Sequence, residues 1–202
     1  KRGCQQGGCG VRIKGLAELG CWVTGRGMGT GMPASEPVLD TLRIPQDVPG
    51  LYKLMEGEDQ YLFSTTVQHQ TADAFGSWLE HMVATSFNDF RVVRLAPGAE
   101  PVGYVHDYDF RLRDGHCRIA VCIDPSLRAT GVGAIAAIRF VAMLFNTYPL
   151  RKVYSTVYDY NKESLRTNLA AGFVDEGTLE DFRYYDGDNY ALHYLSLDRQ
   201  TF

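Results

Sequence analysis

Hydrophobic residues alternate with polar ones in several short stretches of the chain and recur at helical spacing in others, which predicts a mixed α/β protein. The alternating stretches are rich in β-branched and aromatic residues, as strands usually are. The predicted strands span residues 38–44, 90–95, 101–110, 116–123, 152–158, 173–184 and 189–198. The predicted helices span residues 45–57, 71–86, 133–148 and 161–171. This order predicts one central sheet, mixed and mostly antiparallel, that is flanked by helices.

Capping residues support the boundaries of the last predicted helix. Asn161 is a favourable N-cap, and Gly172 is a favourable residue just beyond a helix end. Leu165 and Leu169 lie four positions apart within this helix, so both are expected to face the core. The helix over 133–148 is apolar nearly all round, which predicts that it is well buried.

Composition narrows the class of protein. The chain has 202 residues, of which 45% are hydrophobic and 22% charged, as is typical of one globular domain. The formal net charge of −4 gives no support to a nucleic-acid partner bound through overall charge. An apolar run of about 20 residues, which a membrane helix needs, is missing, so we expect no membrane partner.

The first 31 residues differ from the rest of the chain. Glycine recurs throughout them and regular apolar spacing is missing, so this segment offers little surface to bury. We interpret residues 1–31 as an extension that is poorly structured or added to the natural chain, whose start would be near Met32. An arm that packs on a partner is the alternative. Residues 32–202 are predicted to form the functional domain.

Cysteine usage favours a reducing compartment. Five cysteines are present, at positions 4, 9, 21, 117 and 122, and this odd number lacks the spacing of a disulfide framework. We therefore expect reduced thiols and a cytoplasmic location. The first three cysteines have no histidine near them to complete a zinc site, so no metal is predicted.

The most informative stretch is Ile123-Asp-Pro-Ser-Leu-Arg-Ala-Thr-Gly-Val-Gly133, a turn between a predicted strand and a predicted helix. Backbone amides in such a turn can bind phosphate, because the glycines remove side chains and a helix begins there. Arg128 can add a positive fork for the same anion. The turn lacks the Lys-Ser/Thr pair of a Walker loop and the G-x-G-x-x-G dinucleotide fingerprint.

The pattern Arg-x-x-Gly-x-Gly in this turn resembles the pyrophosphate loop of the GNAT acyltransferase superfamily. Downstream, Asn161-x-x-Ser164, then Gly172-Phe173 and Glu176-Gly177, resemble the second half of the GNAT fold. These motifs are similar to those of the branch with ribosomal-protein N-terminal acetyltransferases and small-amine acetyltransferases. The resemblance implies a sheet in which two splayed strands admit the pantetheine arm, with acetyl-CoA as the acyl donor. It implies an N-acyltransferase in which a primary amine attacks the thioester directly in a ternary complex.

The resemblance also implies which residues hold the acyl-CoA. Those around the pyrophosphate would be Arg128, Ala129, Thr130, Gly131, Val132, Gly133 and Ala134. The backbone of Val121, Cys122 and Ile123 would pair with the pantetheine as an added strand does. Asn161 and Ser164 would contact the CoA arm, although an N-cap Asn and a first-turn Ser also stabilise a helix without any ligand.

The acid and the base are less clear from the sequence. Many GNAT relatives place a tyrosine acid seven residues after the position of Asn161, and Asn168 stands there instead. His116 can titrate near neutral pH and is one candidate base, although an exposed residue beside a hairpin turn is the favoured interpretation of it. Its competitors are Asp107 and Asp109 on the preceding strand, together with Tyr104, His106, Tyr108 and the Tyr158-Asp159-Tyr160 cluster.

The acceptor implied by the resemblance is a small-molecule amine or a protein N terminus, and the last hairpin would pair two copies of the chain in a homodimer. Two other functions stay open. One is a GNAT-like module that binds acyl-CoA without catalysis, and the other is an unrelated α/β protein that binds a nucleotide phosphate through the same loop.

Overall fold

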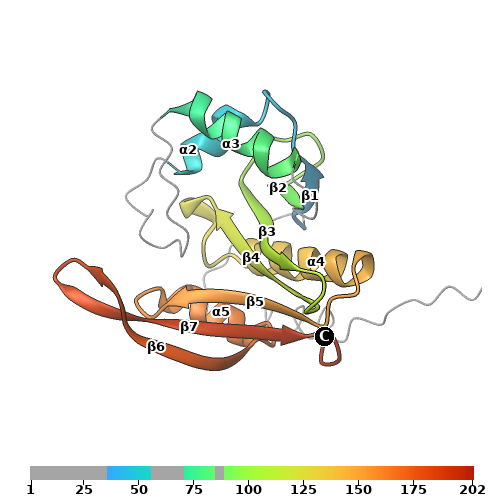
Figure 1. The fold of residues 1–202 in the computed structure, drawn as a ribbon. Helices are drawn as coiled ribbons and strands as arrows, with labels where there is room; N and C mark the ends of the chain where they lie inside the picture. Colours follow the sequence, from blue (N-terminus) through green and yellow to red (C-terminus); the bar gives the residue numbers. More distant parts are fainter. Residues whose placement is uncertain (1–35, 56–70, 85–88) are drawn as a thin grey trace, which may run out of the picture.

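The computed structural model describes residues 36–55, 71–84 and 89–202 (Figure 1). The segment expected to be an extension, 1–31, lies outside these residues. The described elements, in chain order, are β1 (Val38–Thr41), α2 (Val48–Met55), α3 (Ala72–Ala84), β2 (Phe90–Arg94), β3 (Gly103–Arg111), β4 (His116–Ile123), the 3-10 helix η2 (Pro125–Leu127), α4 (Val132–Thr147), β5 (Lys152–Tyr158), α5 (Lys162–Ala170), β6 (Val174–Tyr185) and β7 (Asp188–Asp198).

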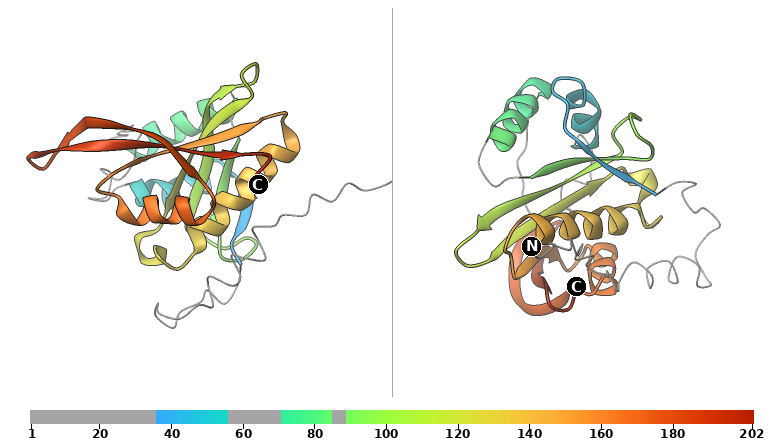
Figure 2. Two further views of the ribbon diagram at one scale, coloured as in Figure 1. Left: turned by 90° about the horizontal axis from the view of Figure 1, so that it is seen from below. Right: turned by 90° about the vertical axis from the view of Figure 1, so that its right-hand side faces the viewer.

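The strands form one seven-stranded sheet in the order β1-β2-β3-β4-β5-β7-β6. Neighbouring strands are antiparallel except β4 and β5, which are parallel. Helices α2 and α3 cover one face of the sheet, and α4 and α5 lie on the other (Figures 1 and 2). This arrangement confirms the predicted α/β fold with a mixed, mostly antiparallel central sheet.

The middle of the sheet opens between β4 and β5. Only three residue pairs join the two strands, and the last of them is Arg118 with Tyr154. Beyond Arg118 the strands diverge, while β4 stays paired with β3 as far as Ile123. The structure therefore has the splayed pair of strands that the family resemblance implies.

Each face of the sheet has its own buried cluster. The cluster under α4 contains Val105, Cys117 and Phe140, and the cluster under α2 and α3 contains Phe75 and Tyr104. Alternation along the strands sends successive side chains to opposite faces. On β3, for example, this separates Tyr104 on the α2–α3 face from Val105 on the α4 face.

Most predicted boundaries agree with the structure, and three predictions are wrong: the end of the first strand, the burial of Leu169, and the start of the first helix, which is Val48 rather than Pro45. The first strand ends at Thr41 rather than Ile44, because the backbone of Arg43 pairs with Asp47: the Arg43 N–H donates to the Asp47 carboxylate, and the Asp47 N–H donates to the Arg43 carbonyl. Leu169 is 46% exposed, although it shares a helix face with Leu165, which packs on the core; the contact of this face with the core therefore ends before the last turn of α5.

A buried arginine ties the first strand and α2 to the sheet. The Arg94 guanidinium is almost fully buried and donates to both carboxylate oxygens of Asp47, each at 2.7 Å. It also donates to the Asp40 carboxylate at 2.9 Å and to the Ala99 carbonyl at 2.6 Å. These bonds join β1, the turn before α2 and the loop between β2 and β3.

Candidate active site

The opening between β4 and β5 exposes backbone groups of β4 on one side only. The Asp124 N–H donates to the Val102 carbonyl at 2.9 Å, so the backbone of Asp124 faces β3. Because successive residues of a strand direct their backbone groups to alternate sides, Cys122 also faces β3, whereas Val121 and Ile123 face the opening. Of the three residues expected to pair with pantetheine, two therefore present free backbone groups, and the Cys122 backbone is used by the sheet.

The loop after β4 is a tight turn held by its own side chains. The Asp124 carboxylate accepts from the N–H and the hydroxyl of Ser126, at 2.9 and 2.6 Å, and begins η2. These two bonds to Ser126 are the main reason why the pKa of Asp124 lies below its usual range. The Thr130 hydroxyl donates to the Leu127 carbonyl at 2.6 Å and closes the far end of the turn.

Two residues of the loop have left-handed backbone conformations. Gly131, the N-cap of α4, has a φ of +89°, which glycine adopts without steric cost. Ala129 has a φ of +59°, where a side chain is strained. The alanine is therefore a local conformational cost that this chain tolerates.

The start of α4 presents backbone amides to the loop. The first N–H that donates within the helix is that of Ile135, to the Gly131 carbonyl at 3.0 Å. The amides of Val132, Gly133 and Ala134 have no partner within the helix, and they point out of its positive end. A Cβ atom at Gly133 would lie 3.2 Å from Cγ1 of Ile123, so glycine also permits the close approach of α4 to β4.

The two α5 residues expected to contact CoA have local structural roles. The Asn161 side chain caps α5 by accepting from the Ser164 N–H at 3.2 Å. Asn168, at the position of the absent tyrosine, donates to the Ser164 carbonyl at 2.8 Å. The N-cap prediction is thereby confirmed, and the side chains of Asn161 and Ser164 are only partly buried, so the cap does not cover all of their surface.

An aromatic wall lies on the α2–α3 face, next to the opening. We use this name for Trp78, Phe90, Tyr104, His106 and Tyr108, whose rings contact one another through His106 at centroid distances of 5.8 to 6.2 Å. The strand pattern over 101–110 contained the signal for it, because Tyr104, His106 and Tyr108 alternate and so share one face. Trp78 joins these rings from α3, and its contact with His106 depends on how this helix packs on the sheet.

Arg118 borders the opening on the same face as the aromatic wall. Its guanidinium carbon lies 5.2 Å from the centroid of the Tyr194 ring, and its Nε atom lies 3.5 Å from the Asp109 carboxylate. The site therefore combines a largely buried group of aromatic rings with one cation and one anion. Sequence reasoning did not single out Arg118 or Tyr194, because β4 and β7 become neighbours only through the sheet order.

The structure does not bring His116 to the opening. His116 begins β4 and pairs with Lys152 at the closed end of the β4–β5 contact. It is seven positions from Ile123, about 23 Å along an extended strand. Its ring packs edge-on against Tyr154 at 5.4 Å.

The side chain of Asp107 lies on the α4 face, away from the aromatic wall. It is fully buried, and its Oδ1 atom accepts from the Asp89 N–H at 2.8 Å. Its Oδ2 atom has no partner among the described residues. Burial, together with the charge of Asp89, raises the pKa of Asp107 from 3.8 to about 7. A perturbed carboxyl is thus present, but on the wrong face for an amine held against the aromatic wall.

The two described cysteines are free and buried. Burial raises the pKa of the Cys122 thiol to about 12 and that of Cys117 still further. Since the thiolate is the nucleophilic form, neither side chain is suited to carry an acyl group.

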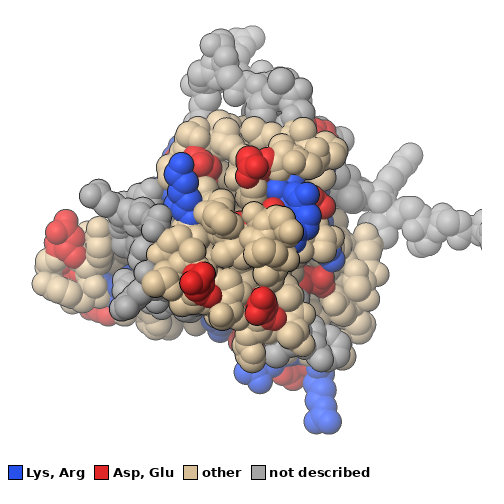
Figure 3. Space-filling model, turned by 90° about the horizontal axis from the view of Figure 1, so that it is seen from above, with Lys and Arg blue, Asp and Glu red and all other residues tan. Residues whose placement is uncertain are grey.

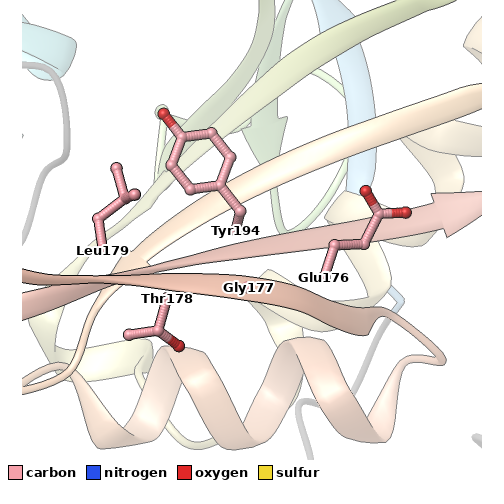
Figure 4. A pocket seen from close by; sticks show the side chains of 5 residues that line it. All are labelled: Glu176, Gly177, Thr178, Leu179 and Tyr194. Carbon is pink, nitrogen blue, oxygen red and sulfur yellow. The ribbon is translucent and has the colours of Figure 1, made fainter.

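An open hollow of about 470 Å³ lies on the last hairpin and is lined by Glu176, Gly177, Thr178, Leu179 and Tyr194 (Figure 4). The register of β6 against β7 shifts between Asp175 and Gly177. This bulge brings Glu176, Leu179 and Tyr194 to one side of the hairpin and leaves Thr178 on the other.

Seen from the α2–α3 side, the described surface is mostly uncharged, and its Lys and Arg side chains do not form one extended basic patch (Figure 3). Within residues 36–55, 71–84 and 89–202, no three His, Cys, Asp or Glu side chains gather as metal ligands would. None of the helices in the same ranges is long and apolar enough to span a membrane.

Comparison with known proteins agrees with this geometry. Residues 38–174 match the family model of the acetyltransferase (GNAT) domain. The SPbeta prophage-derived uncharacterized N-acetyltransferase YokL of Bacillus subtilis is 24% identical over 123 residues, which are 58% of this chain and 68% of that protein.

Many solved structures share the fold, among them the following two. A structure described as a probable acetyltransferase of the GNAT family from Chromobacterium violaceum superposes with a TM-score of 0.68 at 22% identity, over 88% of this chain and 92% of that one. Spermidine N-acetyltransferase from Vibrio cholerae, in complex with CoA and spermine, superposes with a TM-score of 0.74 at 16% identity, over 82% of this chain and 97% of that one.

Proposed function

Because the chain belongs to the GNAT acetyltransferase family, we propose that it moves an acetyl group from acetyl-CoA to a primary amine by direct attack in a ternary complex. One observation carries the proposal: the unpaired stretch of β4 runs straight into the loop whose amides face outward at the start of α4. A strand-like arm ending in phosphates fits this pair of features, because it needs backbone partners and then an anion site.

Each end of the donor has suitable partners. The outward amides of Val132, Gly133 and Ala134, with the Arg128 guanidinium, would bind the pyrophosphate. The tight turn of Ala129, Thr130 and Gly131 sets the direction of these amides.

Further along the arm, the backbone of Val121 and Ile123 would pair with the pantetheine. The amide near Ile123 would polarise the thioester carbonyl as a single hydrogen-bond donor. Asn161 and Ser164, across the opening at the start of α5, would contact the CoA arm.

The acceptor would approach from the α2–α3 face, where the aromatic wall and Arg118 lie. We propose a small primary amine as the acceptor, since a protein of the same fold is a spermidine N-acetyltransferase seen with spermine. An N-terminal amine of a protein is the other acceptor that this open, mostly uncharged face would accommodate.

Ligand-dependent unfolding and CoA-thiol release test the proposal. Acetyl-CoA at a hundredfold excess over its Kd is expected to add about 2.7 kcal/mol to the free energy of unfolding, whereas ATP and NAD add far less. Gly133→Glu should abolish the shift, because its carboxylate would enter the anion site. Gly115→Glu, in the turn before β4, is the matched control and should keep the shift. Equal protection by ATP would instead indicate a nucleotide-phosphate protein.

A panel of spermidine, an amino-acid amide and a short peptide with a free N terminus then tests the chemistry. Release of CoA thiol that depends on one of these amines supports acetyl transfer. Binding of acetyl-CoA without release, on this panel and on a wider set of primary amines, would identify a non-catalytic acyl-CoA-binding module.

We further propose that two copies of the chain pair through β6, the outer strand of the sheet, in a cytoplasmic homodimer. The support for the dimer is that β6 exposes Leu179, Phe182 and Tyr184, with 44%, 52% and 72% of their surfaces accessible. The support for the cytoplasmic location is that Cys117 and Cys122 form no disulfide. Light scattering should give twice the chain mass, and Phe182→Lys should give the chain mass itself.

A further inference from the structure

We propose that His106 is the general base of the reaction and accepts the proton of the attacking amine at its Nε2 atom. This inference rests on the proposed acetyl transfer and adds to it the residue that makes the amine nucleophilic. It assigns a role to a buried histidine at the edge of the sheet opening.

The first argument is position. His106 pairs with Ala120 of β4, so their side chains lie on the same face, with Cβ atoms about 5.5 Å apart. Ala120 follows Arg118, the last residue of β4 that pairs with β5. Ala120 therefore lies in the unpaired stretch, and the small side chain opposite the imidazole is a methyl group at the edge of the opening.

The second argument is the tautomer. The Nδ1 atom of His106 lies 2.9 Å from the Asp107 carbonyl oxygen. A carbonyl only accepts hydrogen bonds, so Nδ1 must carry a proton, and in the neutral ring the lone pair is on Nε2. The backbone of the neighbouring residue thus holds the ring in the form that a base requires.

The third argument is the environment. The rings of Phe90 and Tyr104 stack on His106, and Trp78 meets it edge-on. The titratable or charged groups on this face from the packed strands are the Tyr104 and Tyr108 hydroxyls, the Cys122 thiol, the Arg118 guanidinium and the Asp109 carboxylate. Asp109 is paired with the guanidinium groups of Arg111 and Arg118, so its charge is already balanced and does not stabilise an imidazolium. Burial accordingly lowers the pKa of His106 from 6.5, so the ring is neutral at pH 7.

The proton balance follows from this state. An ammonium acceptor gives one proton to Nε2, and the freed lone pair forms the N–C bond to the acetyl carbon. The C–S bond breaks, CoA leaves as a thiolate, and the remaining extra proton on the new amide nitrogen passes to that thiolate. The imidazolium then releases its proton to water, so one proton leaves per turnover. This route needs no separate acid, because the acceptor nitrogen itself supplies the thiol proton. It therefore agrees with the presence of Asn168 where relatives have a tyrosine.

The test compares His106→Gln with His116→Gln, a histidine on the same face of the sheet but at its closed end. With the fastest amine of the panel, His106→Gln should lower kcat by about 100-fold or more and remove the acid limb of the pH–kcat/KM profile. Acetyl-CoA should still protect this variant against thermal unfolding as it protects the wild type. His116→Gln should keep both the rate and the acid limb. Activity of His106→Gln within about threefold of wild type, with the same acid limb, would overturn the proposal.

Two further measurements keep the result decisive. His106→Phe preserves the ring stacking, so if His106→Gln unfolds, this second variant reports on the base alone. Histidine NMR of the CoA-bound protein should show the Nδ1–H tautomer and a pKa below 6.5 for His106, whether or not any amine is acetylated. The Nε2–H tautomer, or a pKa above 6.5, would overturn the assignment. A wild type that binds acetyl-CoA but releases no thiol would instead contradict the proposed function.

Discussion

The buried carboxyl of Asp107 leads to a prediction about stability and pH. Burial raises its pKa from 3.8 to about 7 in the folded protein, whereas the unfolded chain keeps the ordinary value. Between these two values the folded state holds a proton that the unfolded state has released. Stability therefore falls as the pH rises across this window, by up to about 1.4 kcal/mol per pH unit.

The full penalty follows from the same shift. The pKa rises from 3.8 to about 7, and each unit corresponds to about 1.36 kcal/mol. Above pH 7 the ionisation of Asp107 therefore lowers the free energy of unfolding by at most about 4 kcal/mol. Asp107→Asn stays neutral at every pH, and its Oδ1 atom can still accept the Asp89 N–H. Its amide nitrogen would take the place of the unpaired Oδ2 and cost about 1–3 kcal/mol. The variant should thus be about 1–3 kcal/mol more stable than wild type at pH 8.

Urea unfolding of the ligand-free protein at pH 5, 6, 7 and 8 measures both quantities. The free energy of unfolding of the wild type should fall more steeply with pH than that of Asp107→Asn, and the two proteins should converge or cross near pH 5. Parallel pH dependences would refute the argument that Asp107 is protonated on folding. In the amine assay, the variant should keep activity within about threefold, because this side chain is on the α4 face. A loss of about 100-fold would instead mark it as a base.

Three further predictions concern single side chains and are measured by urea unfolding. Arg94→Ala should lower the free energy of unfolding by about 3–5 kcal/mol, since it leaves the Asp47 carboxylate buried without a cation. Adding Asp47→Asn should restore part of this loss, and additive effects of the two substitutions would contradict the pairing. Ala129→Gly should raise the free energy of unfolding by up to about 1 kcal/mol, because glycine adopts the left-handed conformation without strain. Ala134→Gly, within α4, should lower it by about as much. A lower free energy of unfolding in both variants would show that Ala129 is unstrained. Asn161→Ala should cost about 1 kcal/mol through the lost cap, and Asn161→Asp, which retains the cap, should cost much less.

The sequence was sufficient to predict the helices and strands and the turn between β4 and α4, because both depend on short-range patterns. The alternation over 116–123 and 152–158 predicted β4 and β5 to the residue. The glycines at 131 and 133 marked a turn whose left-handed N-cap and close helix approach the structure bears out. The CoA contacts themselves remain a proposal.

The catalytic candidates could not be sorted from the sequence, because their usefulness depends on which face and which end of the sheet they occupy. His116 and Asp107 had suitable chemistry, yet one lies at the closed end of β4 and the other under α4. His106 was one histidine among several until the register placed it opposite Ala120. Register depends on turn geometry as well as on the alternating pattern, and the shift between Tyr108 and Arg111 near the turn is not visible in that pattern.

The short join between β4 and β5 has a consequence for how the chain folds. On one side of it, β1 to β4 are successive antiparallel neighbours, and on the other β5, β6 and β7 lie close together in the chain. Each half can form through contacts of modest sequence separation, apart from the segment between β1 and β2. The parallel join closes a longer loop that contains α4, which costs loop entropy, and only three residue pairs form in return. We therefore expect it to form late, after both halves have collapsed, and to be the first part of the sheet to come apart.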